Sequence, residues 1–504
     1  MMEMDMGAEL SKIMPELWLA ALALILITLS SLLPQGQKRP VTWFAIGGLL
    51  SSLIPAIALL KGPAQLAFDK TYVVDSFAVF FKLLCISASV VVLLMGLTHF
   101  AGRRAEGEIP TMVVLATLGM EVLAGSNDLI LIALSLQLIT VASYILVGML
   151  KEEPRSGEAA LKFFLFSATA GAVMLYGMSF LYGLSGSLNL VELARKLPGA
   201  QPGLVVLALS LVLVGYGFKI TLFPFHAWAP DTYQGAATPV AAFLSVGPKA
   251  AALAVLVRTL VIAFPGDLAG WPLLVGLSAA VTMSFGNIVA LRQTDLRRLL
   301  AYSSIAQAGY LLMGVTVARL DPLALAGLLL YLIVYLFMNL GAFAVVTAVE
   351  QEYGTVELKA YNGLASRRPL LALSLTLCLL SLAGIPPLAG FVGKTVLFGA
   401  ALAAGFGWLA VIAAINTAIS LYYYVKVIAP MYLKTDILGL SSLAAPDLAG
   451  QDGNVPPALP KAVARFSPAL DFVILLTTSG TLLIGIFPEP ALELARLGTR
   501  LLGG

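Results

Sequence analysis

Long runs of apolar residues recur along the whole length of this sequence. Most of them approach the roughly 20 residues that an α-helix needs to cross the hydrocarbon core of a bilayer. Because backbone amides in lipid must be hydrogen-bonded internally, runs of this length are expected to be helical. We therefore predict an all-α integral membrane protein with about 14 transmembrane helices, forming a single polytopic domain over residues 1–504. The predicted spans cover residues 15–33, 40–60, 74–98, 110–126, 128–150, 160–183, 204–225, 238–262, 271–291, 300–318, 323–349, 370–403, 407–431 and 470–487.

Composition supports this prediction and excludes several classes of function. Hydrophobic residues make up 60% of the 504 residues and charged residues only 11%, whereas soluble chains carry roughly 25% charged residues. The 30 basic and 27 acidic side chains nearly balance, so there is no basic excess of the kind that binds nucleic acid. We expect the partners to be the lipid bilayer and other membrane proteins, and no nucleic acid.

Few side chains in this chain are suited to hold a metal or an electron carrier. Cys85 and Cys378 both fall inside apolar runs, and the only histidines are His99 and His226. Without a CxxC or HExxH spacing, a zinc, haem or iron–sulfur site held by this chain alone is not expected. We predict no cofactor and no metal in this chain, and we expect His99 to be a solvated residue at a helix end.

The distribution of basic residues predicts the orientation in the membrane. One set of alternate loops carries 15 lysines and arginines, while the opposite set, including both tails, carries 8. The richer set is expected to face the cytoplasm, which leaves both termini on the outer side. A polar stretch over residues 434–467, rich in Pro, Gly, Ala and Asp, is predicted to be a cytoplasmic linker.

Three lysines lie deep inside predicted spans, where a charge costs at least about 2.5–3.5 kcal/mol. They are Lys219, Lys249 and Lys394, and each has Gly or Pro within a few residues. Such residues indicate helix breaks, where freed backbone carbonyls can solvate an ammonium group. Because a buried lysine can exchange its proton, this pattern is typical of a proton relay.

The other charged groups in the spans are more ambiguous. Lys82, Arg258 and Lys426 lie near predicted span ends, where we expect them to reach the interface without further function. The run Tyr422–Tyr424 is interpreted as packing or an interfacial belt.

A relay lysine needs a group that changes its charge state, and the sequence offers two candidates. Glu121 is the only acidic residue well inside a predicted span in the first half of the chain, so it is the candidate carboxylate facing Lys219. His226 follows Pro224 at a predicted helix break, where an imidazole either passes protons or is simply a hydrogen-bonded structural group.

Several long segments are similar to one known family. The sequences GYGFKITLFPFHAWAPDTYQGAATPVAAFLSVGPKAA, LRQTDLRRLLAYSSIAQAGYLLMG and LAGIPPLAGFVGKTVLF occur in this order. They resemble the antiporter-like membrane subunits of respiratory complex I, in particular the subunit N family of bacterial NADH:quinone oxidoreductase. The resemblance covers about residues 75–430.

This resemblance implies a fold and an activity. It implies two inverted five-helix repeats over residues 110–262 (helices 4–8) and 271–431 (helices 9–13), with discontinuous helices 7 and 12. It also implies a proton channel along Lys219, Lys249 and Lys394, coupled to electron transfer from NADH to quinone in other subunits. NADH, FMN, iron–sulfur clusters and quinone are then expected in partner subunits of the complex I membrane arm and its attached domains. The location implied is the bacterial cytoplasmic (inner) membrane.

One departure from the family pattern bears on the mechanism. The family usually places a glutamate on helix 5 as the partner of the helix 7 lysine, and Gln137 stands there in this sequence. Either Glu121 replaces that carboxylate, or it is a weaker modulator, or there is no lysine–acid switch. The alternative functions are a subunit of a multisubunit cation/proton antiporter or membrane-bound hydrogenase and, from a different class, a free-standing solute transporter. The electron donor, the quinone type, pumping by this subunit and the proton exit path are not readable from the sequence.

Overall fold

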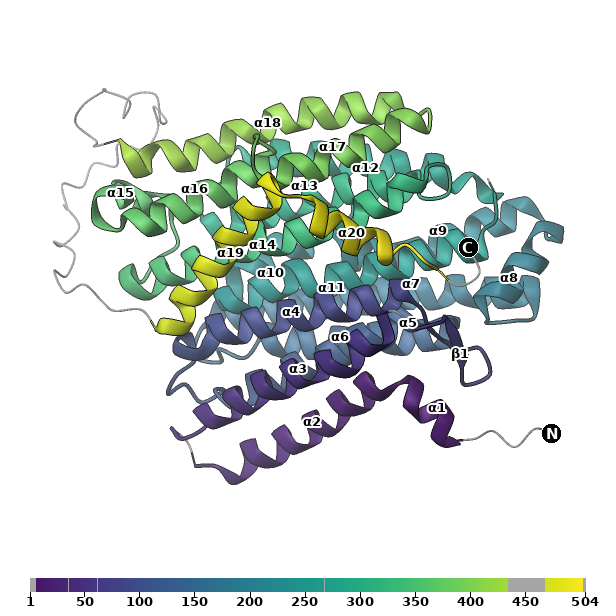
Figure 1. Ribbon diagram of the computed structural model, residues 1–504, viewed down its shortest axis with the longest axis horizontal. Helices are drawn as coiled ribbons and strands as arrows, with labels where there is room; N and C mark the ends of the chain where they lie inside the picture. The colour runs from purple at the N-terminus through teal and green to yellow at the C-terminus, as the bar shows by residue number, and fades with distance from the viewer. Residues whose placement is uncertain (1–5, 35, 61, 267, 434–466, 502–504) are drawn as a thin grey trace.

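The computed structural model describes residues 6–34, 36–60, 62–266, 268–433 and 467–501. Long helices lie side by side along one direction (Figure 1). Within these ranges, 13 helices are long and apolar enough to cross a membrane. They are α2 (Met14–Leu32), α3 (Arg39–Leu60), α4 (Ser76–His99), α5 (Glu108–Gly125), α6 (Leu129–Val147), α7 (Pro154–Ser185), α9 (Pro202–Ile220), α11 (Thr238–Arg258, continued by a π-helical turn Thr259–Ala263), α12 (Trp271–Ala290), α13 (Leu296–Thr316), α14 (Pro322–Tyr353), α18 (Gly407–Tyr432) and α19 (Pro468–Ile486).

The predicted twelfth span is not one long helix. It consists of α16 (Pro369–Ala383) and α17 (Ala389–Ala403), each 15 residues long. In the described ranges, 13 helices have the full length of a span, and the shorter pair α16 and α17 takes the place of the twelfth span, which the resemblance implies to be discontinuous. The remaining elements are short: α1 (Met6–Lys12), β1 (Gln65–Ala67), β2 (Tyr72–Val74), α8 (Leu190–Lys196), α10 (Trp228–Gly235), α15 (Leu364–Arg367), α20 (Glu489–Leu497) and 3-10 turns at Leu197–Gly199, Leu268–Gly270 and Leu358–Tyr361.

Burial distinguishes central from peripheral helices. Every residue in the most apolar stretch of α11 is buried, against 28% in α3. Helix α11 packs against α4, α5, α9 and α14. A side chain on α11 is therefore shielded from lipid on all sides, and this is where Lys249 lies.

Two interruptions lie where the sequence predicts them. Helix α9 ends at Ile220, because Thr221 adopts a left-handed conformation with φ +70°, and α10 begins only at Trp228. Helix α16 ends at Ala383, followed by Gly384 with φ +88°. The peptide bonds Phe223–Pro224 and Pro386–Pro387 in these breaks are cis.

The second break also requires a close approach of two backbones. A Cβ atom on Gly390 would lie 1.8 Å from the carbonyl oxygen of Ser381. The Gly390 amide donates to Ser381 Oγ at 2.9 Å. Only glycine at this position lets the first turn of α17 pack directly on the last turn of α16.

The last predicted span, 470–487, ends where α19 ends, but the helix that follows it was not predicted. Helix α19 ends at Ile486, and after Phe487 and Pro488 the chain continues as α20, which packs against α14 and α4. The first described helix, α1, and the last described residues after α20 lie toward the same end of the bundle (Figure 1). The predicted linker 434–467 falls outside the described residues except for Ser467.

Candidate functional site

The three lysines selected from the sequence are all buried in the interior. Lys219 on α9 is 4% exposed, Lys249 on α11 is 1% exposed and Lys394 on α17 is 3% exposed. In the part of the chain that the structure describes, no carboxylate oxygen lies within 4.0 Å of any of their ammonium nitrogens. Neutral oxygens accept hydrogen bonds from all three ammonium groups, and an aromatic ring lies close to those of Lys219 and Lys394.

Lys219 lies at the carboxyl end of α9, where the helix dipole favours a positive charge. Its Nζ donates to Thr140 Oγ1 at 3.0 Å and lies 5.5 Å from the centroid of the Phe163 ring. A small cavity of about 20 Å³ beside it is lined in part by Gln137 and Ser167, which is space for about one water molecule with polar partners. The freed carbonyls expected around this lysine are not its partners, since a threonine hydroxyl takes that place.

Lys249 follows Pro248 in the middle of α11. Its Nζ donates to the carbonyl oxygen of Ser304 at 2.7 Å and to Ser304 Oγ at 2.5 Å. Tyr335 on α14 donates to the same Oγ at 2.9 Å. One serine on α13 therefore connects the lysine on α11 to the tyrosine on α14.

Lys394 is solvated by the break between α16 and α17. Its Nζ donates to the carbonyl oxygens of Leu382 and Ala383, both at 3.0 Å. These carbonyls lie in the last turn of α16, where the helix can supply no backbone donor. The Tyr310 ring centroid lies 4.4 Å from the same nitrogen. At this lysine the prediction of freed backbone carbonyls is confirmed.

Side chains on one face of α13 link the surroundings of Lys249 and Lys394. Ser304, Gln307 and Tyr310 follow at three-residue spacing, which places them on one side of a helix. Gln307 Nε2 donates to the Leu382 carbonyl at 3.0 Å, the same oxygen that Lys394 binds. A row of polar groups thus runs from one lysine to the other.

The sequence reasoning missed these α13 groups, although a signal was present. The segment AYSSIAQAGY places polar residues three and four apart inside an apolar run. The expectation for Tyr422–Tyr424 was also incomplete, because Tyr424 shares a 2.5 Å hydrogen bond with Ser303 and Tyr423 donates to Asn287 Oδ1 at 3.0 Å. Tyrosine hydroxyls buried at a bundle centre need polar partners, and these tyrosines have them.

The structure does not bring Glu121 and Lys219 together. Glu121 is fully buried on α5, and the charged groups that act on its carboxyl are Glu16 of α2 and Lys82 of α4. The predicted depth of a residue in its helix says nothing about the direction in which its side chain points. Helix α5 packs against α2 and α4 as well as α6 and α11, and the Glu121 side chain belongs to the α2–α4 side.

The expectation for Lys82 and Arg258 is wrong. Both are 0% exposed. Lys82 Nζ lies 2.6 Å from Glu16 Oε1, and Arg258 donates to both carboxylate oxygens of Asp75 at 2.9 and 2.8 Å. Distance from a helix end predicted access to the interface, but neighbouring elements cover these ends. Lys426 meets the expectation, since it is exposed and donates to a backbone carbonyl.

His226 lies in the break after α9, where the sequence predicts it. It is 8% exposed, and its ring centroid lies 5.5 Å from that of Phe223 and 4.4 Å from that of Phe285 on α12. Its Nδ1 has no hydrogen-bond partner among the described residues. Aromatic rings, rather than a lysine, are its neighbours in the structure, and a relay role stays a prediction.

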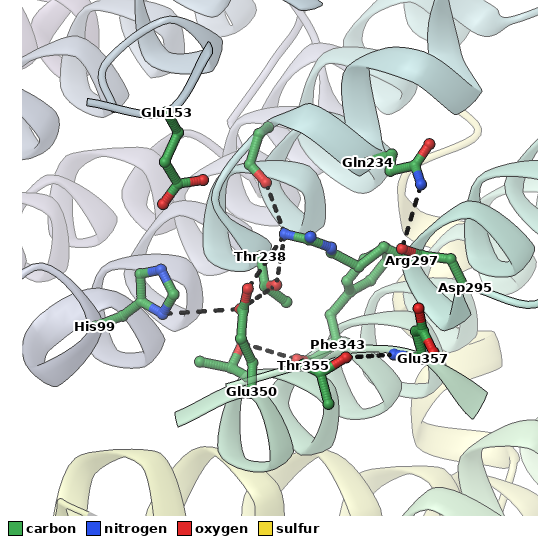
Figure 2. Close-up of polar contacts among 12 residues, drawn as sticks. His99, Glu153, Gln234, Thr238, Asp295, Arg297, Phe343, Glu350, Thr355 and Glu357 are labelled. Carbon is green, nitrogen blue, oxygen red and sulfur yellow. Dashed lines mark hydrogen bonds and ion pairs between the residues drawn. The ribbon is translucent and has the colours of Figure 1, made fainter. Parts of the chain in front are cut away.

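His99 is not the solvated residue that the sequence suggested. It is 9% exposed, and its Nδ1 lies 4.0 Å from Glu350 Oε2 (Figure 2). Arg297 lies 3.3 Å from the other oxygen of Glu350 and donates to the Ala236 carbonyl at 3.0 Å. Thr238 donates to Glu350 at 2.5 Å. This polar cluster joins the α10–α11 junction to α4, α13 and α14.

Comparisons with known proteins agree on one family. The family described as NADH:quinone oxidoreductase/Mrp antiporter, TM, matches residues 126–420. The NADH-quinone oxidoreductase subunit N of Desulfitobacterium hafniense is 39% identical, over 97% of this chain and 98% of its own length. A chain of respiratory complex I from Thermus thermophilus is 32% identical with a TM-score of 0.77, covering 95% of this chain and 98% of that one. A chain of the Mrp complex from Dietzia sp. is 22% identical with a TM-score of 0.82, over 97% of both chains, a likeness that shows the shared fold alone.

Proposed function

The chain belongs to the NADH:quinone oxidoreductase/Mrp antiporter transmembrane family, within its subunit N group, and we propose that its buried lysines are the proton path of that assembly. It is a membrane subunit of proton-translocating NADH:quinone oxidoreductase and works with the other membrane-arm subunits. Electrons pass from NADH to quinone in other subunits of the complex, which would hold NADH, FMN, the iron–sulfur clusters and quinone. The membrane is the bacterial inner membrane, and we infer from the basic loops that both termini face the periplasm.

One observation carries the proposal: three buried lysines lack a carboxylate within 4.0 Å among the described residues. A buried charge without a partner costs several kcal/mol. A lysine can avoid this cost by releasing its proton, whereas an arginine cannot. Unpaired buried lysines are therefore suited to accept and pass on protons.

The α13 side chains support a continuous route through the second half of the chain. In the proposed path, a proton moves between Lys249 and Lys394 along this face of α13. The Ser304 hydroxyl can accept one proton while it releases another, whereas Gln307 and the Leu382 carbonyl orient and solvate the Lys394 ammonium without carrying the proton themselves. The two inverted repeats, 110–262 and 271–431, are part of this proposal, with Lys219 and Lys394 on the interrupted helix of each.

Gln137 gives the Lys219 end of the path a different character. The Gln137 amide lines the same small cavity as Lys219. A neutral side chain therefore stands beside this lysine at the position where the family usually has a glutamate. We infer that Lys219 works without a carboxylate switch and that Thr140 and the cavity solvate its ammonium. We infer that His226, which packs against the rings of Phe223 and Phe285, stabilises the conformation of the chain between α9 and α10.

The test uses the assembled complex in proteoliposomes with three variants, Lys219→Ala, Lys249→Ala and Lys394→Ala. Protons pumped per NADH oxidised are measured together with electron transfer to quinone. We expect each variant to lose pumping, while Lys426→Ala, which removes an exposed lysine on α18, keeps it. Full pumping in all three variants would overturn the proposed path.

The antiporter reading remains the second candidate because the Mrp chain shares the fold. The observation against it is the sequence identity, 22% there compared with 39% to subunit N. Sodium-driven proton exchange by vesicles that contain this chain and no other NADH:quinone oxidoreductase subunit would favour the antiporter function instead.

A further inference from the structure

A second group of buried charges lies away from the three lysines of the proposed path. Glu16 on α2, Tyr72 on β2, Lys82 on α4 and Glu121 on α5 are 5%, 3%, 0% and 0% exposed. We call these four residues the outer cluster, because Glu16, Lys82 and Glu121 lie toward the helix ends that are predicted to face outward, and Tyr72 lies in the hairpin at the same end. Two carboxyl groups and one ammonium group are enclosed there.

Within the outer cluster, the Tyr72 hydroxyl and the Lys82 ammonium both contact Glu16. The Tyr72 hydroxyl donates to Glu16 Oε1, and Lys82 Nζ lies 2.6 Å from the same oxygen. The Lys82 nitrogen also lies 5.5 Å from the Tyr72 ring centroid. Glu16 therefore has both a cation and a hydroxyl donor as partners.

Glu121 has no such support. Neither of its carboxyl oxygens has a hydrogen-bond partner among the described residues. From the helices around it, α2 brings Glu16 and α4 brings Lys82 and the thiol of Cys85.

Another pair of buried charges near the outer cluster, Arg258 and Asp75, forms an ion pair of its own. On α11, Arg258 donates a hydrogen bond from each of its terminal guanidinium nitrogens to a carboxylate oxygen of Asp75. Among the described residues, the cation that acts on Glu121 is Lys82, which is in contact with Glu16.

The charges in the outer cluster do not balance if every group is ionised. Two carboxylates and one ammonium would leave one negative charge in a space closed to water, and two carboxylates that share such a site do not both stay ionised. A carboxyl group buried without donors takes up a proton rather than keep its charge. We propose that Glu121 is protonated in the resting protein and that the outer cluster is a proton-holding site distinct from the lysine path.

The position of this site connects it to the helix that carries Lys249. A Cβ atom on Gly247 would lie 3.1 Å from Met120 Sδ, next to Glu121 in sequence. Cys85 Sγ lies 3.9 Å from the Gly247 carbonyl oxygen. The turns of α5 and α4 that carry Glu121 and Lys82 therefore pack on the turn of α11 that precedes Pro248 and Lys249, through Met120 and Cys85. If Lys82 moves from Glu16 to Glu121, the proton passes from Glu121 to Glu16, and the total charge of the cluster is unchanged.

The test measures the carbonyl stretch of protonated carboxyl groups by infrared difference spectroscopy on the purified, assembled complex. Glu121→Gln keeps the shape of the neutral side chain and should remove one such band, whereas Glu158→Gln, which changes an exposed carboxylate on α7, should not. Glu16→Gln should remove the same band, since Lys82 is then free to pair with an ionised Glu121. Lys82→Met should add a second band, since neither glutamate then has a cation.

Two results would overturn the proposal. One is a spectrum that Glu121→Gln leaves unchanged. The other is a band that persists in Glu121→Gln and disappears in Glu16→Gln, which would put the proton on Glu16. If the variants do not assemble, carbon-13 labelling of glutamate in the unaltered complex replaces them, and the absence of any labelled protonated band contradicts the assignment. Lys249→Ala should leave the band in place, so failure of the lysine path and failure of this site are distinguishable.

Discussion

The ion pair between Asp75 and Arg258 provides a stability prediction with a clear magnitude. Both side chains are 0% exposed in the pair, and two hydrogen bonds of 2.9 and 2.8 Å join them. Asp75 is also the N-cap of α4, where its Oδ1 accepts the Ala78 amide at 2.8 Å. Asp75→Asn keeps a good capping residue but leaves the Arg258 guanidinium buried without its counter-charge.

Removing one partner of a buried ion pair costs about 3–5 kcal/mol. Since about 1.4 kcal/mol corresponds to a tenfold change in an equilibrium constant, Asp75→Asn should lower the folding equilibrium constant by roughly 10² to 10⁴. Replacing both partners, with Asn at 75 and Met at 258, should recover much of this loss, because no unpaired charge is then buried.

The assay is unfolding of the purified full-length chain in mixed micelles with increasing SDS, followed by circular dichroism. Asp128 gives a matched control, because it caps α6 through the Ile130 amide at 2.9 Å, at a half-buried position. Asp128→Asn should shift the unfolding midpoint little. An Asp75→Asn variant no less stable than Asp128→Asn would refute the reasoning.

Three further predictions follow from single contacts. Thr140→Val removes the hydroxyl that accepts a hydrogen bond from Lys219. Because a hydrogen bond to a charged group contributes about 1.5–3 kcal/mol, proton pumping by the complex should slow by at least about tenfold. Thr169→Val, at an exposed position on α7, is the control. Gly390→Ala places a methyl group against the Ser381 carbonyl and should destabilise the chain by about 1–3 kcal/mol or more in the SDS assay, whereas Gly399→Ala, with open space around it on the same helix, should be neutral or stabilising. Ser304→Ala removes the Oγ that joins Lys249 to Tyr335 and should reduce pumping in proteoliposomes more than Tyr335→Phe does; equal pumping in both variants and the unaltered complex would exclude the α13 route.

Much of the fold was predictable because its determinants are local in sequence. Spans follow from apolar length, and the two interruptions near Pro224 and Pro386 follow from residues that cannot continue a helix. The short helix α20 was missed, because the prediction relied on long apolar runs and this segment is too short to be one. Helix position and helix breaks are thus encoded by neighbouring residues.

The partners of buried charges were not predictable from local sequence. Glu121 and Lys82 belong to one cluster although 39 residues separate them, and the contact depends on how α4 and α5 rotate about their axes. The sequence gives the depth of a residue in its helix, because each residue adds about 1.5 Å. It does not give the direction of the side chain when the helix is apolar all round, since no polar face then orients it.

The buried cations divide by chemistry as well as by position. Lys82 and Arg258 face carboxylates, and the positive charge of each is compensated in place. Lys219, Lys249 and Lys394 face hydroxyls, carbonyls and rings, which solvate an ammonium without fixing its charge. An ion pair resists the loss of a proton because the remaining carboxylate would be left alone in a medium of low dielectric. A lysine bound only by neutral oxygens leaves no such charge behind when its proton departs. A buried lysine is therefore suited to keep its charge in one setting and to release its proton, as the proposed path requires, in the other, and the distinction rests on whether a carboxylate lies beside it.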